Sequence, residues 1–173
     1  MVAVTGIMAA GKSTVAALLT ERFERSAHVR GDLFRRMIVR GRAPITTALT
    51  PEDRRQLALR RELAAQTADA YARAGFVAVV QDIWLGSDLA ALVRVLRFRP
   101  LHVVVLAPRP DAVARREAER RKSGYVDGWT AEAMDRILRL ETPRLGLWLD
   151  TSDQTPQETA SEVMRRLDEA AVP

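Results

Sequence analysis

The stretch Gly6-Ile7-Met8-Ala9-Ala10-Gly11-Lys12-Ser13 follows an apolar segment, VAVTG at 2–6, and opens a segment with helical apolar spacing that runs to about residue 25. It matches the pattern G-x-x-x-x-G-K-[ST] in the required context of strand before and helix after. Glycine lets the main chain wrap a phosphate group without a Cβ clash, and successive N–H groups at a helix N-terminus attract its negative charge. A glycine-containing turn that only starts a helix is the alternative. We predict that residues 6–14 form a phosphate-binding loop.

Each position of this loop has an expected role toward a nucleotide. The ammonium of Lys12 reaches the β- and γ-phosphates and takes part in catalysis, and the hydroxyl of Ser13 is a ligand of Mg²⁺. Thr14 adds a hydroxyl near the α-phosphate. ATP and Mg²⁺ are therefore the predicted cofactors, and the predicted nucleotide-binding residues of the loop are Gly6, Ala9, Ala10, Gly11, Lys12, Ser13 and Thr14.

Outward from the loop, five apolar segments alternate with segments of helical pattern. Their apolar runs are continuous, which is typical of parallel strands covered on both faces. We predict a single α/β domain over residues 1–173, with a parallel sheet and helices on both sides. The predicted strands are 2–6, 26–30, 76–82, 101–107 and 145–150, and the predicted helices are 12–25, 32–40, 51–74, 87–97, 110–122, 130–140 and 156–170.

Two aspartates stand where predicted strands end. Asp32 follows the second strand, where a carboxylate can face the cleft beyond the strand ends and accept a proton from an acceptor hydroxyl; capping the next helix is the alternative role. Asp82 ends the third strand, where an acid can hold Mg²⁺ through water; capping is again the alternative. Arg35 and Arg36 either bind acceptor anions or are solvated. Trp84 either walls the acceptor pocket or belongs to the core.

The segment ARREAERRKSGYVDG, from 114 to 128, joins an Arg-rich helix to a loop flanked by glycines. Phosphoryl transfer builds negative charge on the γ-phosphate oxygens, which guanidinium groups neutralise well. We predict a lid over about 116–129 that excludes water. Arg116 and Arg120 are its candidate catalytic residues, with Arg120 also binding nucleotide, and Arg121 is a further candidate.

Composition limits the classes of protein. The chain carries 27 Lys and Arg against 22 Asp and Glu, and the absence of cysteine excludes disulfides, thiolate metal sites and a cysteine nucleophile. Because many Arg stand among Glu and Asp without interleaved aromatic residues, solvated helix faces are favoured over a nucleic-acid surface. No apolar run is long enough to span a membrane, and the N-terminus lacks the basic region of a signal peptide, so we expect a cytoplasmic protein.

Taken together, these motifs resemble the small P-loop kinases of the nucleoside-monophosphate-kinase-like group. The chloramphenicol phosphotransferase-like and tunicamycin-resistance-like proteins are the nearest, and gluconate and shikimate kinases are more distant. The resemblance rests on GIMAAGKS, Asp32, Asp82, the RREAERR–SGY segment and LDTSDQTPQETASEVMRRL. It implies a sheet order of 2-3-1-4-5 with a lid, Asp32 as base toward the acceptor hydroxyl, and adenine near Thr151 and Ser152. The segment after Asp82 lacks the Arg that nucleotide-acceptor kinases usually carry, which disfavours a nucleoside monophosphate as acceptor.

The leading hypothesis is an ATP- and Mg²⁺-dependent kinase that transfers the γ-phosphoryl group to a hydroxyl of a small molecule, either a metabolite or an antibiotic-like compound. A polynucleotide 5′-hydroxyl kinase is one alternative. A regulatory switch that binds nucleotide without an acceptor is another. The sequence identifies neither the acceptor nor the oligomeric state.

Overall fold

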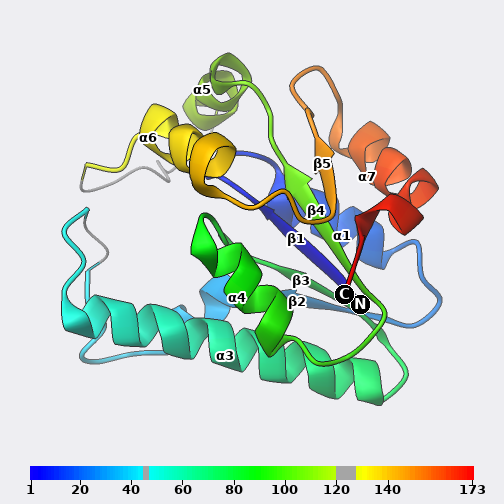
Figure 1. Ribbon diagram of the computed structural model, residues 1–173, viewed down its shortest axis with the longest axis horizontal. Helices are drawn as coiled ribbons and strands as arrows, with labels where there is room; N and C mark the ends of the chain where they lie inside the picture. The colour runs from blue at the N-terminus through cyan, green and yellow to red at the C-terminus, as the bar shows by residue number, and fades with distance from the viewer. Residues whose placement is uncertain (45–46, 120–127) are drawn as a thin grey trace.

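A twisted, mainly parallel sheet with helices on both faces forms the fold (Figure 1). The computed structural model describes residues 1–44, 47–119 and 128–173. The strands are β1 (Val2–Gly6), β2 (Ser26–Arg30), β3 (Val77–Gln81), β4 (Leu101–Leu106), β5 (Leu147–Leu149) and β6 (Ala171–Val172). The helices are α1 (Lys12–Thr20), α2 (Gly31–Arg36), α3 (Pro51–Arg73), α4 (Ser87–Val95), α5 (Pro110–Ala118), α6 (Ala131–Arg136) and α7 (Pro156–Arg165), with a π-helical segment at Ile137–Glu141 and a 3₁₀ segment at Leu167–Ala170.

The order of the strands is β2-β3-β1-β4-β5, with all neighbours parallel, which confirms the predicted fold class and order. β6 is an addition that the sequence did not indicate, and it pairs antiparallel with the beginning of β4 through Leu101 and Val172. Every residue of β1 is buried, as expected for a central strand with helices on both sides. Because parallel strands end at one edge, the loops after β1, β2, β3, β4 and β5 gather at that edge.

The helices form two layers. α1 packs with α7, whereas α3 packs with α2 and α4, and both α1 and α3 contact β2 and β3 (Figure 1). Two of the helices begin with capping boxes, at Thr50 with Asp53 and at Thr155 with Glu158, each followed by proline at the first helical position. α1 and α2 end earlier than predicted, at Thr20 and Arg36.

None of the helices in the described ranges 1–44, 47–119 and 128–173 is both long and apolar enough to cross a membrane. The cytoplasmic location stays a prediction.

Candidate active site

The loop between β1 and α1 is curled at the edge of the sheet where the strands end. Gly6 has a φ of 147°, and a Cβ there would lie 2.4 Å from the carbonyl oxygen of Leu106 on β4, so only glycine fits. Ala9 and Gly11 also have positive φ, 59° and 94°. Left-handed residues among right-handed ones turn successive main-chain N–H groups toward one side, which makes an anion-binding concavity. The predicted geometry of residues 6–14 is therefore present.

The first turn of α1 supplies the charged and hydroxyl groups of the loop. Gly11 is the N-cap of α1, and Lys12, Ser13 and Thr14 follow it with no acidic side chain in the turn. The Nζ of Lys12 donates a hydrogen bond to the carbonyl oxygen of Ile7 at 2.7 Å, so its ammonium lies across the loop. The partial positive charge of the helix N-terminus adds to that of Lys12. The loop thus concentrates positive potential at one point.

A cavity of about 580 Å³ opens over this loop. It brings together most of the predicted site: the loop residues Ala9, Ala10, Gly11, Lys12, Ser13 and Thr14, and the more distant residues Asp32, Arg36, Asp82, Arg116 and Thr151. Gly6 and Ser152 do not line it. Arg120 and Arg121, and most of the predicted lid, lie outside the described residues. The cavity also has a wall residue that the sequence analysis did not select, Arg60 of α3.

Asp32 lies in the first turn of α2 and faces the cavity. The N-cap of α2 is Arg30, which makes no side-chain capping bond, so the capping role considered for Asp32 is wrong. One carboxylate oxygen of Asp32 lies 2.9 Å from a terminal nitrogen of Arg36, and the other lies 3.5 Å from the Nε of Arg30. Because the side chain of Asp32 is 28 % exposed, it remains accessible to a molecule that enters the cavity.

Asp82 and Arg60 form a bidentate ion pair. The Nε of Arg60 donates to Oδ2 of Asp82 at 2.6 Å, and its Nη2 donates to Oδ1, which also accepts the main-chain N–H of Ile83 at 2.7 Å. The two side chains are 15 % and 4 % exposed. Oδ2 keeps a lone pair beyond its bond to Arg60, so a water-mediated contact with a metal ion remains available to it.

Gly31 is required by the position of Asp82. A Cβ at residue 31 would lie 2.1 Å from Oδ2 and 2.7 Å from Cγ of Asp82. The absence of a side chain at the start of α2 therefore lets the carboxylate fill the space between the ends of β2 and β3. Trp84, two residues further on, is fully buried and belongs to the core, which is one of the two roles considered for it.

Arg116 links α5 to the loop between β5 and α7. Its Nη2 donates to the carbonyl oxygens of Thr151 and Gln154, the latter at 3.4 Å. The guanidinium group therefore lies next to Thr151. Arg116 and Asp32 are far apart in the sequence, but both line the same cavity. Thr151 is 2 % exposed, and its hydroxyl has no hydrogen-bond partner among the residues that the structure describes.

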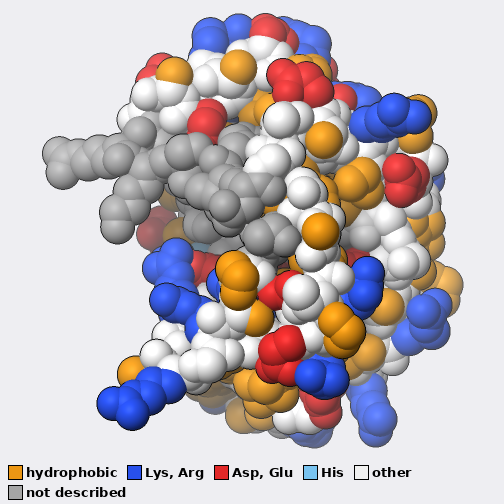
Figure 2. Space-filling model, turned by 90° about the vertical axis from the view of Figure 1, so that its left-hand side faces the viewer, with side chains coloured by type: hydrophobic (Ala, Val, Ile, Leu, Met, Phe, Trp, Pro, Cys, Tyr) orange, Lys and Arg blue, Asp and Glu red, His pale blue; other side chains and the backbone are white. Residues whose placement is uncertain are grey.

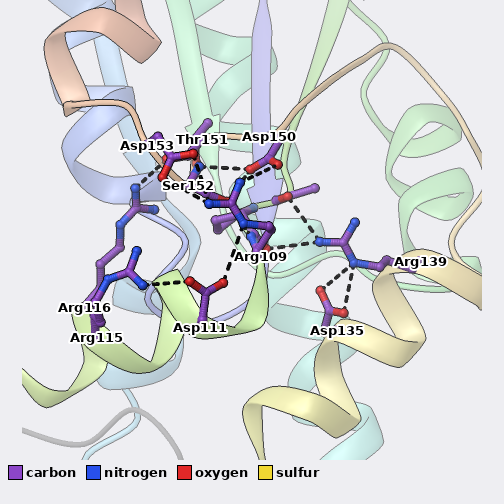
Figure 3. Close-up of polar contacts among 12 residues, drawn as sticks. Arg109, Asp111, Arg115, Arg116, Asp135, Arg139, Asp150, Thr151, Ser152 and Asp153 are labelled. Atoms are coloured by element: carbon purple, nitrogen blue, oxygen red, sulfur yellow. Dashed lines mark hydrogen bonds and ion pairs between the residues drawn. The ribbon is translucent and has the colours of Figure 1, made fainter.

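Ser152 organises the neighbouring loops. Its hydroxyl and main-chain N–H both donate to Asp150, and its hydroxyl accepts the N–H of Arg109 at 2.7 Å. The hydrogen bonds from Ser152, with the charge of Arg109 nearby, hold the pKa of Asp150 below its ordinary value. Arg109 also pairs with Asp153 at 3.0 Å, so the loops after β4 and β5 are bound to each other (Figure 3). Adenine contact by Ser152 stays a prediction.

A second arginine, Arg139, binds the main chain just after β4. Arg139 pairs with Asp135 at 2.9 Å and donates to the carbonyl oxygens of Ala107 and Pro108 (Figure 3). Sequence reasoning missed Arg60, Arg109 and Arg139, because the Arg-rich composition gives no local signal that separates them from solvated arginines.

The curled loop, the cavity above it and the 2-3-1-4-5 sheet define a P-loop α/β fold of the kinase-like kind. Residues 1–143 match a family model described as an AAA domain, and the chain belongs to this family. No curated protein matches the chain. The resemblance to P-loop kinases expected from the sequence is confirmed at the level of family and fold.

Solved structures of similar fold include three small-molecule kinases or related proteins. An unliganded sugar kinase from Janibacter has 21 % identity and a TM-score of 0.70, covering 98 % of this chain and 94 % of that one. The tunicamycin resistance protein of Deinococcus radiodurans has 19 % identity and a TM-score of 0.69, covering 99 % and 97 %. The APS kinase of Mycobacterium tuberculosis, in complex with AMPPNP and APS, has 23 % identity and a TM-score of 0.70, covering 96 % of both chains. These likenesses establish the fold.

Proposed function

We propose that this chain is an ATP- and Mg²⁺-dependent phosphotransferase that acts on a hydroxyl group of a small molecule. The observation that carries the proposal is that one cavity joins Lys12 and Ser13 of the loop to the carboxylate of Asp32. A nucleotide held on the loop would place its terminal phosphate toward the side of the cavity that holds Asp32. The solved APS kinase, with its bound AMPPNP, supports nucleotide binding by this fold.

The residues present fit a magnesium ion. In phosphoryl-transfer sites Mg²⁺ is bound through one or two protein oxygens, substrate phosphates and water. The hydroxyl of Ser13 and the free lone pair of Asp82 Oδ2 supply such oxygens on the same cavity. No group of three or more acidic, His or Cys ligands exists among residues 1–44, 47–119 and 128–173, and a site of this kind does not need one. When bound, the ion would neutralise negative charge on the phosphates.

The positions of the side chains support the following proposed reaction. The acceptor hydroxyl replaces Arg36 at Asp32, and the carboxylate takes the hydroxyl proton as the oxygen attacks the γ-phosphorus. A bond forms between that oxygen and phosphorus, and the bond from phosphorus to the β–γ bridging oxygen breaks, so ADP leaves with the electron pair. Lys12 and the loop N–H groups stabilise the negative charge on the transferring group.

At the other end of the cavity, Arg116 and Thr151 would enclose the adenine, with Ser152 fixing the loop. Arg116 already hydrogen-bonds main-chain carbonyls there, so we propose that it lies beside the adenine rather than at the γ-phosphate. Arg120 remains the lid residue proposed to contact phosphate.

The test is transfer of label from γ-labelled ATP to a panel of hydroxylated metabolites, antibiotics and oligonucleotides. Lys12→Ala should abolish transfer while the melting temperature stays near that of the wild type. Asp32→Asn should lower kcat by about 10²- to 10⁴-fold, the usual size of general-base catalysis, with ATP affinity nearly unchanged. Near-normal turnover in Asp32→Asn would remove Asp32 from the catalytic role. Slow ATP hydrolysis with no labelled product would favour the alternative of a regulatory switch that binds nucleotide without an acceptor.

A further inference from the structure

Arg36 and Arg60 line the same cavity as Asp32. Arg60 lines the cavity, and its guanidinium is oriented from behind by Asp82 through Nε and Nη2. No hydrogen bond from its Nη1 occurs within the described part of the chain. A buried ion pair adds little stability because both charges lose their hydration. A guanidinium held in this way is, however, preorganised to bind a second anion through its remaining N–H groups.

The loop between α2 and α3 adds more positive charge beside Arg60. Gln56, one turn before Arg60 on α3, accepts the N–H of Ala43 at 2.9 Å and donates to the carbonyl oxygen of Gly41 at 2.7 Å. One side chain therefore holds the main chain on both sides of Arg42. Arg35 of α2 donates to the carbonyl oxygen of Ala43 and fixes the same loop from the other side.

These contacts hold like charges near one another. Burial lowers the pKa of Arg35, and the charges of Arg42 and Arg60 lower it further, while Asp53 opposes them. Asp53 is itself bound to the N–H and hydroxyl of Thr50 in the capping box. Figure 2 shows the face that carries this loop, with Lys and Arg side chains gathered on the left of its lower half.

Acidic partners balance only part of this group. Asp32 and Asp82 are already paired with Arg36 and Arg60, and Asp53 is engaged with Thr50. Repulsion among guanidinium groups that a fold holds together is relieved when an anion binds between them. Arg60 and Asp32 line the same cavity, so one acceptor molecule can present an anionic group to Arg60 and a hydroxyl to Asp32.

We propose that the acceptor is a small hydroxylated molecule that also carries a carboxylate or phosphate group, and that Arg60 binds this group while Arg35 and Arg42, which lie outside the cavity lining, add positive charge nearby. This inference rests on the proposed phosphotransferase function and specifies its substrate class. Neutral sugars and neutral antibiotic-like compounds are then poor acceptors.

The first experiment compares acceptors in matched pairs that differ by one anionic group. Gluconate is compared with glucose, and glycerate and glycerol 3-phosphate are each compared with glycerol, so that the carboxylate and phosphate arms are separate. We expect kcat/KM to be on the order of ten- to a hundredfold higher for the anionic member of at least one pair, the usual effect of a charged hydrogen bond. Arg60→Gln should bring that ratio close to one. Equal use of charged and neutral members by the wild type would overturn the inference.

Arg61→Gln is the matched control, because Arg61 is the next residue on α3, pairs with Asp88 and does not line the cavity. It should keep the wild-type preference. Since Arg60→Gln leaves the carboxylate of Asp82 buried without its partner, Arg42→Gln serves as an exposed second variant. It should lower the preference severalfold without altering the melting temperature, and an unchanged preference in both Arg60→Gln and Arg42→Gln would count against the proposed subsite.

The second experiment separates this inference from the proposed function. Inorganic phosphate is titrated calorimetrically into protein whose P-loop is already saturated with AMPPNP and Mg²⁺. We expect one further phosphate to bind to the wild type and to Arg61→Gln, with binding lost in Arg60→Gln. If no compound is phosphorylated but this phosphate binds and depends on Arg60, the function fails and the anion subsite stands. Binding that is equal in all three proteins, or absent in the wild type, refutes the subsite.

Discussion

Replacement of Gly31 by alanine tests the geometry of the candidate site most directly, because two physical effects predict opposite signs. Gly31 is the first residue of α2, and alanine is favoured over glycine in a helix by up to about 1 kcal/mol. Helix propensity alone therefore predicts that Gly31→Ala stabilises the protein. The structure predicts the reverse, since the new Cβ would lie 2.1, 2.7 and 3.0 Å from Oδ2, Cγ and Cβ of Asp82.

The clash cannot be relieved cheaply. Asp82 is 4 % exposed and is held by two hydrogen bonds from Arg60, so the carboxylate must leave its partner or α2 must move. Overpacking of this kind costs about 1–3 kcal/mol. Separation of a buried ion pair adds to that, because an unpaired buried charge costs about 3–5 kcal/mol. We expect a net loss of at least about 2 kcal/mol, which corresponds to a fall in melting temperature of about 4–8 °C for a chain of this size.

Urea unfolding of Gly31→Ala in two backgrounds, wild type and Asp82→Ala, measures the effect and its cause. In the Asp82→Ala background the space beside residue 31 is open, so the same substitution should cost little or even stabilise the protein. The difference between the two costs is the coupling energy between residues 31 and 82. A stabilising Gly31→Ala in the wild type, or an equal cost in both backgrounds, would refute the packing described for this corner of the site.

Three further outcomes follow from individual contacts in the structure. Thr5→Val should cost about 1–3 kcal/mol in urea unfolding, because the Thr5 hydroxyl accepts the N–H of Trp84 at 2.9 Å and donates to its carbonyl oxygen at 3.1 Å. Gly6→Ala should lower both the melting temperature and the affinity for a fluorescent ATP analogue, since no β-carbon fits beside the neighbouring strand. The hydrogen bonds of the capping boxes lower the pKa values of Asp53 and Glu158, so the ionised carboxylates stabilise the folded protein above about pH 4. This stabilisation should be lost as the pH falls toward about 3, which a series of melting temperatures against pH would measure.

The parts of the fold that the sequence predicted are those in which local pattern and burial agree. Four of the five parallel strands lie in mainly apolar runs bounded by glycine, proline or polar residues, whereas β2 (SAHVR) is more polar, and all five form. The start of α3 carries its own capping box, so its first residue is correct. β6 was not predicted because two residues carry no periodicity, and its formation depends on pairing with β4, far away in the chain. The ends of α1 and α2 were placed too late for the related reason that helix ends depend on tertiary packing.

The candidate site divides in the same way, and the division explains why the acceptor is harder to infer than the nucleotide. The phosphate-binding loop is local: its glycines, Lys12 and Ser13 act through main-chain conformation within nine residues, 6–14, so the sequence alone displays it. Asp32 and Asp82 could be found because parallel strands end at one edge of a sheet. Arg60 differs from both, since it comes from the middle of α3, 22 residues before Asp82, among several arginines of identical local pattern. Only the packing of α3 against β2 and β3 selects it. Gly31 is the local sign of the ion pair in the sequence, because a side chain at that position would displace Asp82. The proposed acceptor subsite therefore depends on long-range contacts, whereas the phosphate-binding loop is one continuous segment.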